Sequence, residues 1–152
     1  MSGLVNAGGL IPWGDRMASI STLSRRAASR NRPKRGHHTD CVGPASTCQS
    51  QIAYEKYLNG DFFGNHAALV SMTSIGGEIA ALSGPVMNPY PGTKLGVVEE
   101  GATADLLLVD GNPLEDLSVI GAVDKWFDAP SRNGVETIRI IMKDGKIYKN
   151  TL

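Results

Sequence analysis

The sequence has few cysteines, few aromatic residues and no long hydrophobic segment. No apolar run reaches the roughly 18 residues that suggest a membrane-spanning helix, and the amino terminus lacks the basic-then-apolar order of a secretory signal. The two cysteines, Cys41 and Cys48, are too few for a disulfide framework, and their spacing is not the C-x2-C of a structural zinc site. We therefore expect free thiols in a reducing compartment, and a cytoplasmic location without a membrane partner.

An excess of charge of one sign is also lacking. The formal net charge is zero, which excludes electrostatic steering of the whole chain toward nucleic acid or membrane. The 152 residues fit one domain but are too few for a complete (β/α)8 barrel of roughly 250 residues. With 41% hydrophobic and 20% charged residues, most of the chain is expected to be globular.

Familiar catalytic signatures are missing as well. The sequence holds no G-x-S-x-G, no H-E-x-x-H, no P-loop and no G-x-G-x-x-G between a strand and a helix. His37 and His38 are adjacent, so in an extended chain their rings point to opposite sides and make a poor metal-binding pair. His66 falls in the first turn of a predicted helix, where a structural or exposed role is expected.

The charge is unevenly distributed. Residues 1–48 carry seven Lys and Arg against two Asp, whereas the remainder is acidic. Residues 1–38 form a basic Ser/Arg-rich segment that is predicted to be irregular, because it has no sustained helix or strand period. Three interpretations stay open for it: an organellar transit peptide, a contact with an anionic surface, or a solvated tail without function.

Helices are predicted next in the chain. Residues 49–58 are good helix formers and are followed by Asn59-Gly60, a plausible stop. Residues 66–82 carry apolar side chains at helical spacing, with Asn65 as a candidate N-cap. Within this second helix, Gly76 and Gly77 each cost roughly 1 kcal/mol relative to alanine.

The remainder reads as β-structure. Residues 104–109 predict a buried strand, residues 114–120 a short helix, and residues 137–143 a strand with alternating faces. Asp144-Gly145 then predicts a two-residue hairpin turn into a return strand at 146–148. A loop insertion is expected at Trp126-Phe127 and residues 130–134.

Asp40 is the one suggestive acidic position. It lies in the segment Gly36-His37-His38-Thr39-Asp40-Cys41-Val42-Gly43-Pro44. An aspartate followed by a Gly-Pro loop suits the rim of a barrel active site. A loop aspartate is more often an N-cap or a turn residue, and that interpretation stays open.

Two long motifs carry a resemblance. Residues 96–116 read GVVEEGATADLLLVDGNPLED, and residues 140–148 read IIMKDGKIY. Their order resembles the C-terminal portion of the metal-dependent amidohydrolase superfamily, with the imidazolonepropionase-like and Xaa-Pro-dipeptidase-like enzymes as the most similar branch. The resemblance covers about 110 of the 152 residues. It implies an α/β fold class: the last helices of a (β/α)8 barrel in residues 39–92, and strands of the flanking small β-sandwich in residues 93–152.

The resemblance also implies a chemistry. Such enzymes hydrolyse C–N bonds in amide or peptide substrates with one or two divalent metals, usually zinc, which lower the pKa of a bound water to about 7. Thr39-Asp40 resembles the end of barrel strand eight, where an aspartate binds metal and accepts the proton of that water. The match departs from the pattern at His38, which stands where the family has glycine, and in the basic residues 31–35, which stand where a strand should lead in. The other metal ligands are absent, so the chain alone is not expected to bind the metal.

Three hypotheses follow. The first is that the chain is a C-terminal remnant of such an enzyme and cannot catalyse alone. A reading-frame error upstream of residue 38 is one way in which such a remnant would arise. The second is that it completes a split or oligomeric amidohydrolase. The third is that it is a non-enzymatic module whose basic tail binds an anionic partner. Since the predicted helices normally pack on a barrel, we also expect their apolar faces and the strand at 104–109 to be exposed, and we expect self-association.

Overall fold

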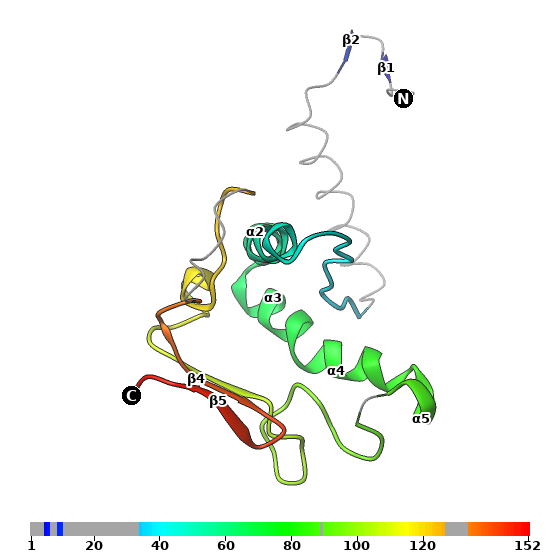
Figure 1. Ribbon diagram of the computed structural model, residues 1–152. Helices are drawn as coiled ribbons and strands as arrows, with labels where there is room; N and C mark the ends of the chain where they lie inside the picture. Colours follow the sequence, from blue (N-terminus) through cyan, green and yellow to red (C-terminus); the bar gives the residue numbers. More distant parts are fainter. Residues whose placement is uncertain (1–4, 7–8, 11–33, 89, 127–133) are drawn as a thin grey trace. The chain divides into compact units, whose positions relative to one another are not determined.

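The computed structural model describes residues 5–6, 9–10, 34–88, 90–126 and 134–152 (Figure 1). It divides the chain into one unit of residues 1–33 and another of residues 34–152. In the first unit, β1 (Val5–Asn6) and β2 (Gly9–Leu10) pair antiparallel, although this segment was expected to be irregular. Residues 11–33 of the predicted basic Ser/Arg-rich segment 1–38 lie outside the described residues.

The second unit begins with a helix longer than predicted. Helix α2 (Ala45–Phe63) does not stop at Asn59-Gly60 but runs on to Gly64, whose φ of 82° ends it. The stop signal fails because Gly60 is buried. A Cβ at Gly60 would lie 2.4 Å from Cδ1 of Leu117, so this glycine serves packing and not chain reversal.

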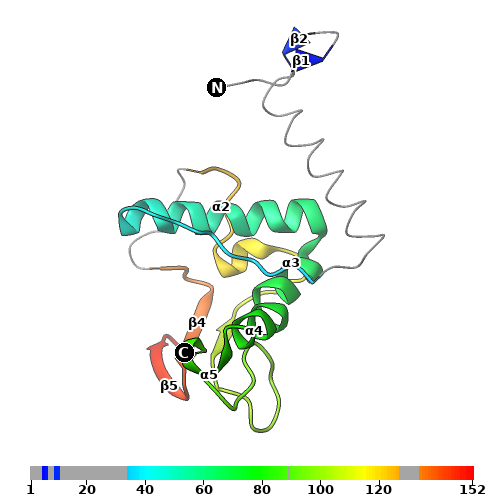
Figure 2. The same ribbon diagram turned by 90° about the vertical axis from the view of Figure 1, so that its right-hand side faces the viewer.

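The second predicted helix is divided in two. Helix α3 (Asn65–Met72) and helix α4 (Ser74–Ala81) meet at Thr73, whose φ of −113° and ψ of −97° interrupt the helical backbone. The N-cap of α3 is Gly64, so Asn65 is the first residue of the helix and not its N-cap; its side-chain Nδ2 donates to the carbonyl of Leu114 at 3.1 Å. Figure 2 shows α2 lying lengthwise, with α3 and α4 descending from its C-terminal end. A short helix, α5 (Gly84–Met87), follows.

The strands form a three-stranded antiparallel sheet in the order β3-β4-β5. Its members are β3 (Leu106–Val109), β4 (Ile138–Lys143) and β5 (Lys146–Asn150). Asp144 and Gly145 join β4 to β5 with φ values of 52° and 73°, as a type I′ turn requires. The predicted hairpin is therefore confirmed.

The burial predicted from one apolar run is wrong, and one predicted helix is shorter than expected. The run at 104–109 predicted a buried strand, but Leu106, Leu107 and Leu108 are 36%, 54% and 48% exposed, which agrees with the exposure expected of this strand without a barrel. Strand β3 is an edge strand, and burial depends on a covering layer that the strand's own sequence does not supply. The helix expected over 114–120 is a 3-10 helix, η1 (Leu117–Ile120), which begins where Asp116 accepts a hydrogen bond from Ser118 N at 2.8 Å.

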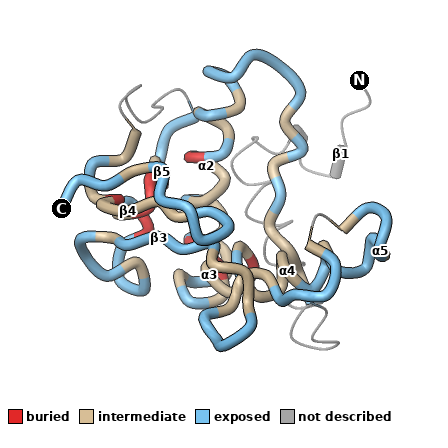
Figure 3. The backbone as a smooth tube through the Cα atoms, turned by 60° about the horizontal axis from the view of Figure 1, so that its bottom comes forward, coloured by how far each residue is buried: buried red, intermediate tan, exposed pale blue. Residues whose placement is uncertain are grey.

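The core lies where η1 packs against α3. Ala68, Leu117, Ile120 and Ala122 are buried there, and the partly buried side chains around them come from α3, β3 and η1. Figure 3 shows how short the buried stretches are within the described chain. None of the described helices is both long enough and apolar enough to cross a membrane.

Candidate functional site

The sequence-predicted site residue, Asp40, lies in an extended segment that precedes α2. We call residues 34–44 the strap. Asp40 is exposed and has a φ of 45°, a left-handed conformation that aspartate tolerates better than most residues. The strap residues before Asp40 form no strand, so the structure does not give Asp40 the strand that the resemblance would place before it. The N-cap of α2 is Pro44, so Asp40 does not cap this helix.

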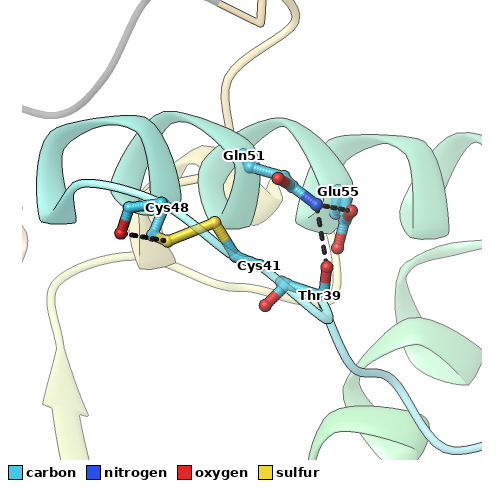
Figure 4. Close-up of a disulfide and its surroundings, with 6 residues drawn as sticks. Thr39, Cys41, Cys48, Gln51 and Glu55 are labelled. Carbon is cyan, nitrogen blue, oxygen red and sulfur yellow. Dashed lines mark hydrogen bonds between the residues drawn. A yellow bond between two sulfur atoms is a disulfide. The ribbon is translucent and has the colours of Figure 1, made fainter.

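Hydrogen bonds fasten the first half of the strap to the helices. The backbone N–H of His37 donates to the carbonyl of Ser71 at 3.1 Å, and Nδ1 of His37 lies 3.2 Å from Nδ2 of Asn59. One residue before Asp40, the carbonyl of Thr39 accepts a hydrogen bond from Nε2 of Gln51 at 2.8 Å (Figure 4). The backbone on the amino-terminal side of Asp40 is therefore held in place.

The contact between His37 and Asn59 determines the tautomer of the neutral His37 ring. Because the Asn59 amide can only donate from Nδ2, Nδ1 of His37 is the acceptor and the neutral ring carries its proton on Nε2. Burial lowers the pKa of His37, and nearby Glu55 partly opposes this. His37 thus joins the strap to α2 and α3, whereas His38 and His66 are exposed.

The expectation of free thiols is wrong. Cys41 and Cys48 form a disulfide, with their Cα atoms 5.5 Å apart (Figure 4). The chain reverses between Asp40 and Pro44, and this brings Cys41 back beside the first turns of α2. Sγ of Cys48 lies 3.8 Å from the carbonyl of Gly43, a packing contact because a disulfide sulfur carries no hydrogen to donate.

The described residues do not by themselves fit a catalytic metal. Among them, no three His, Cys, Asp or Glu side chains come close enough together to hold an ion. A catalytic zinc site takes three protein ligands, and Asp40 offers one carboxylate. We derive no metal-dependent step from this arrangement.

A separate apolar cavity lies between the helices and the sheet. Its volume is about 620 Å³, and α3, α4, the segment 95–98 and β3 line most of it. Lys56 of α2 reaches one wall, where its Nζ donates to the carbonyl of Ile120 at 2.9 Å. Burial lowers the pKa of Lys56. No sequence pattern predicts this cavity, because its walls come from segments far apart in the chain.

The chain is similar to known proteins in its three-dimensional structure. Neither a protein-family model nor a curated protein matches the chain. A solved structure described as an amidohydrolase is similar at 27% identity with a TM-score of 0.62, covering 88% of this chain and 26% of that one. Another, described as an uncharacterized protein, is similar at 28% identity with a TM-score of 0.51, covering 76% of this chain and 23% of that one.

A third similar structure is described as a prolidase complexed with N-methylphosphonate-L-proline. Its identity is 24% and its TM-score 0.54, over 94% of this chain and 30% of that one, and this likeness is one of fold. The mixed helix-and-strand unit is thus consistent with part of a hydrolase fold. The chain is related to the amidohydrolase superfamily, and it spans about a quarter of the length of the structures that it matches.

Proposed function

We propose that residues 39–152 are the C-terminal part of a metal-dependent amidohydrolase that hydrolyses C–N bonds. In this proposal, residues 39–92 hold the last loop and helices of the barrel, and residues 93–152 hold strands of the flanking β-sandwich. The observation that carries it is the likeness to an amidohydrolase structure, which covers 88% of this chain but 26% of that one. The motifs at 96–116 and 140–148 support it independently of the coordinates.

Asp40 has a limited role in this proposal. It would contribute one carboxylate ligand to a divalent metal, zinc in the family, and would serve as the proton acceptor for the water that such a metal activates when bound. The remaining ligands have to come from outside the described residues, since these hold one candidate carboxylate and a catalytic zinc takes three protein ligands. In this proposal the described residues alone do not make a complete site, and the substrates are amides or peptides, with Xaa-Pro dipeptides and cyclic amides as the first to test.

A second candidate function is that of a complementing subunit. The observation that favours it is the exposed leucines of β3, which form an edge strand without charged residues within it. Such an edge is a template for pairing with another chain, either a barrel-bearing partner or a second copy of this one. In this alternative, Asp40 completes a site whose other ligands the partner supplies. A non-enzymatic module with a basic tail gains no support, because most of that tail lies outside the described residues.

Complementation tests the proposal. The full chain is co-expressed with the part of the similar amidohydrolase that it does not cover, and hydrolysis of Xaa-Pro dipeptides and cyclic amides is measured with added zinc. We expect hydrolysis when both polypeptides are present and none from this chain alone. The matched control is Asp40→Asn, which keeps the shape of the side chain and removes its charge.

Two results would contradict the proposal. Hydrolysis by the purified chain alone, lost in Asp40→Asn, would show that its site is complete. Equal activity of the wild-type and Asp40→Asn complexes would show that Asp40 is not the ligand. A variant at the neighbouring exposed histidine, His38→Gln, is expected to behave as the wild type.

A further inference from the structure

The strap is fastened in two different ways on either side of Asp40. On its amino-terminal side, hydrogen bonds through His37 and Thr39 hold the strap to α2 and α3. On its carboxyl-terminal side, the disulfide between Cys41 and Cys48 ties the turn to the first turns of α2. Within the described residues, one further hydrogen bond holds the turn. The backbone N–H of Cys48 donates to the carbonyl of Pro44 at 3.1 Å, and this is the first hydrogen bond of α2.

We infer that this disulfide is a redox-controlled clasp, which dithiols open and which fixes the turn that presents Asp40. The turn has little packing of its own. Val42 is 96% exposed, and a Cβ placed at Gly43 would meet no atom within 4 Å. Because neither a covering side chain nor a second hydrogen-bond ladder from the described residues holds the turn, its order depends on the sulfur–sulfur bond.

The clasp is accessible to a reductant. Cys41 and Cys48 are each only half-buried, and they flank a run of exposed residues from 42 to 47. A thiolate of a small dithiol or of a dithiol protein attacks one sulfur and forms a mixed disulfide, releasing the other cysteine as a thiolate that takes up a proton. The second thiol of the reductant then displaces the remaining cysteine. Two electrons pass to the protein, both cysteines become thiols, and the reductant leaves as its own disulfide.

Reduction of the disulfide between Cys41 and Cys48 is expected to loosen the backbone of the turn. Reduced Cys48 acquires an S–H that can donate to the carbonyl of Gly43, so the first turn of α2 keeps a weak contact, but Cys41 is released. The backbone from Asp40 to Pro44 then samples many conformations, while Gln51 still holds Thr39. The meaning of this for catalysis rests on the proposed function, because a freed Asp40 would no longer be positioned as a ligand. The clasp itself does not depend on that function.

Hydrogen exchange of the full chain, read by mass spectrometry, tests the clasp. The oxidised protein is compared with protein reduced by dithiothreitol, and alkylation confirms that both thiols are free after reduction. We expect the amides of residues 48–51, which donate the first hydrogen bonds of α2 beside the disulfide, to exchange at least about tenfold faster after reduction, which corresponds to about 1.4 kcal/mol of local stability. Residues 52–63 of α2 are expected to be unchanged, and reoxidation is expected to restore the slow exchange.

The double variant Cys41→Ser/Cys48→Ser is the matched control. It should exchange quickly at residues 48–51 whether or not dithiothreitol is present. The proposal is overturned if oxidised and reduced protein exchange alike at these residues, or if mildly oxidised protein still alkylates at both cysteines. Since exchange is read without any substrate, failure of the complementation assay leaves this result unaffected, and the two proposals can fail separately.

Discussion

Two adjacent glycines in α4 should respond in opposite ways to the same substitution. Sequence reasoning alone expects Gly76→Ala and Gly77→Ala both to stabilise the helix by up to about 1 kcal/mol, because glycine has more freedom to lose on folding. The structure distinguishes them. A Cβ at Gly76 would lie 3.5 Å from the carbonyl oxygen of Ser71, an ordinary contact, whereas a Cβ at Gly77 would lie 2.1 Å from the carbonyl oxygen of Leu95.

The magnitude follows from what has to move. At Gly77 the obstacle is backbone and cannot rotate away, so α4 and the segment around Leu95 have to separate. We take the upper part of the usual overpacking cost, about 3 kcal/mol, against a propensity gain of about 1 kcal/mol. Gly77→Ala is then expected to lose about 2 kcal/mol of unfolding free energy while Gly76→Ala gains up to about 1 kcal/mol. The two melting temperatures should differ by roughly 6–12 °C for a chain of this size.

Thermal unfolding followed by circular dichroism, together with urea unfolding, measures the difference. The two variants differ by one position in the same helix, so each serves as the control for the other. Equal stability of the two, or a higher melting temperature for Gly77→Ala, would refute the close packing of α4 against the segment 95–98.

Three further predictions concern the core, the strap and the sheet edge. Leu117→Ala should lower the unfolding free energy by about 2–5 kcal/mol, whereas Leu114→Ala, at a side chain that is 53% exposed, should change it little; similar urea midpoints for the two would contradict the assigned core. Because burial lowers the pKa of His37 below 6.5, the unfolded chain binds this proton more tightly, so stability should be greatest above about pH 6.5 and fall as the pH drops toward the folded-state pKa. His37→Gln should remove that part of the pH dependence in urea titrations, and an unaltered slope would count against it. Leu107→Lys should reduce self-association in sedimentation velocity by charging the edge of β3, and an unchanged concentration dependence would show that β3 is not the associating edge.

The features that sequence could predict are those set by local chemistry. Asp144-Gly145 defines its hairpin because the turn needs two residues with positive φ, and nothing distant alters that requirement. The stop expected at Asn59-Gly60 failed for the opposite reason, because contact with Leu117 gives Gly60 a packing role that local propensity does not contain. The exposure of β3 was expected only because the resemblance implies a barrel that is missing, since an apolar run indicates what a strand would bury but not whether a covering layer is present.

In the candidate site, too, some features could be predicted from the sequence and others could not. Asp40 was found through resemblance, and its left-handed backbone agrees with the turn that Gly43-Pro44 suggests. The cysteine pairing was missed because a spacing of seven residues fixes no distance until the chain reverses direction. The role of His37 needs Asn59 and Ser71, which lie more than twenty positions away and reach the strap only after α2 and α3 have formed.

The contact between Gly60 and Leu117 also constrains which pairs of residues related proteins can carry at positions 60 and 117. The leucine methyl group occupies the space where any larger residue at 60 would place its first carbon. Natural relatives that carry alanine or serine at position 60 therefore need a side chain at 117 that is shorter or turned away, so the two positions, 57 apart in the sequence, are expected to change together in evolution.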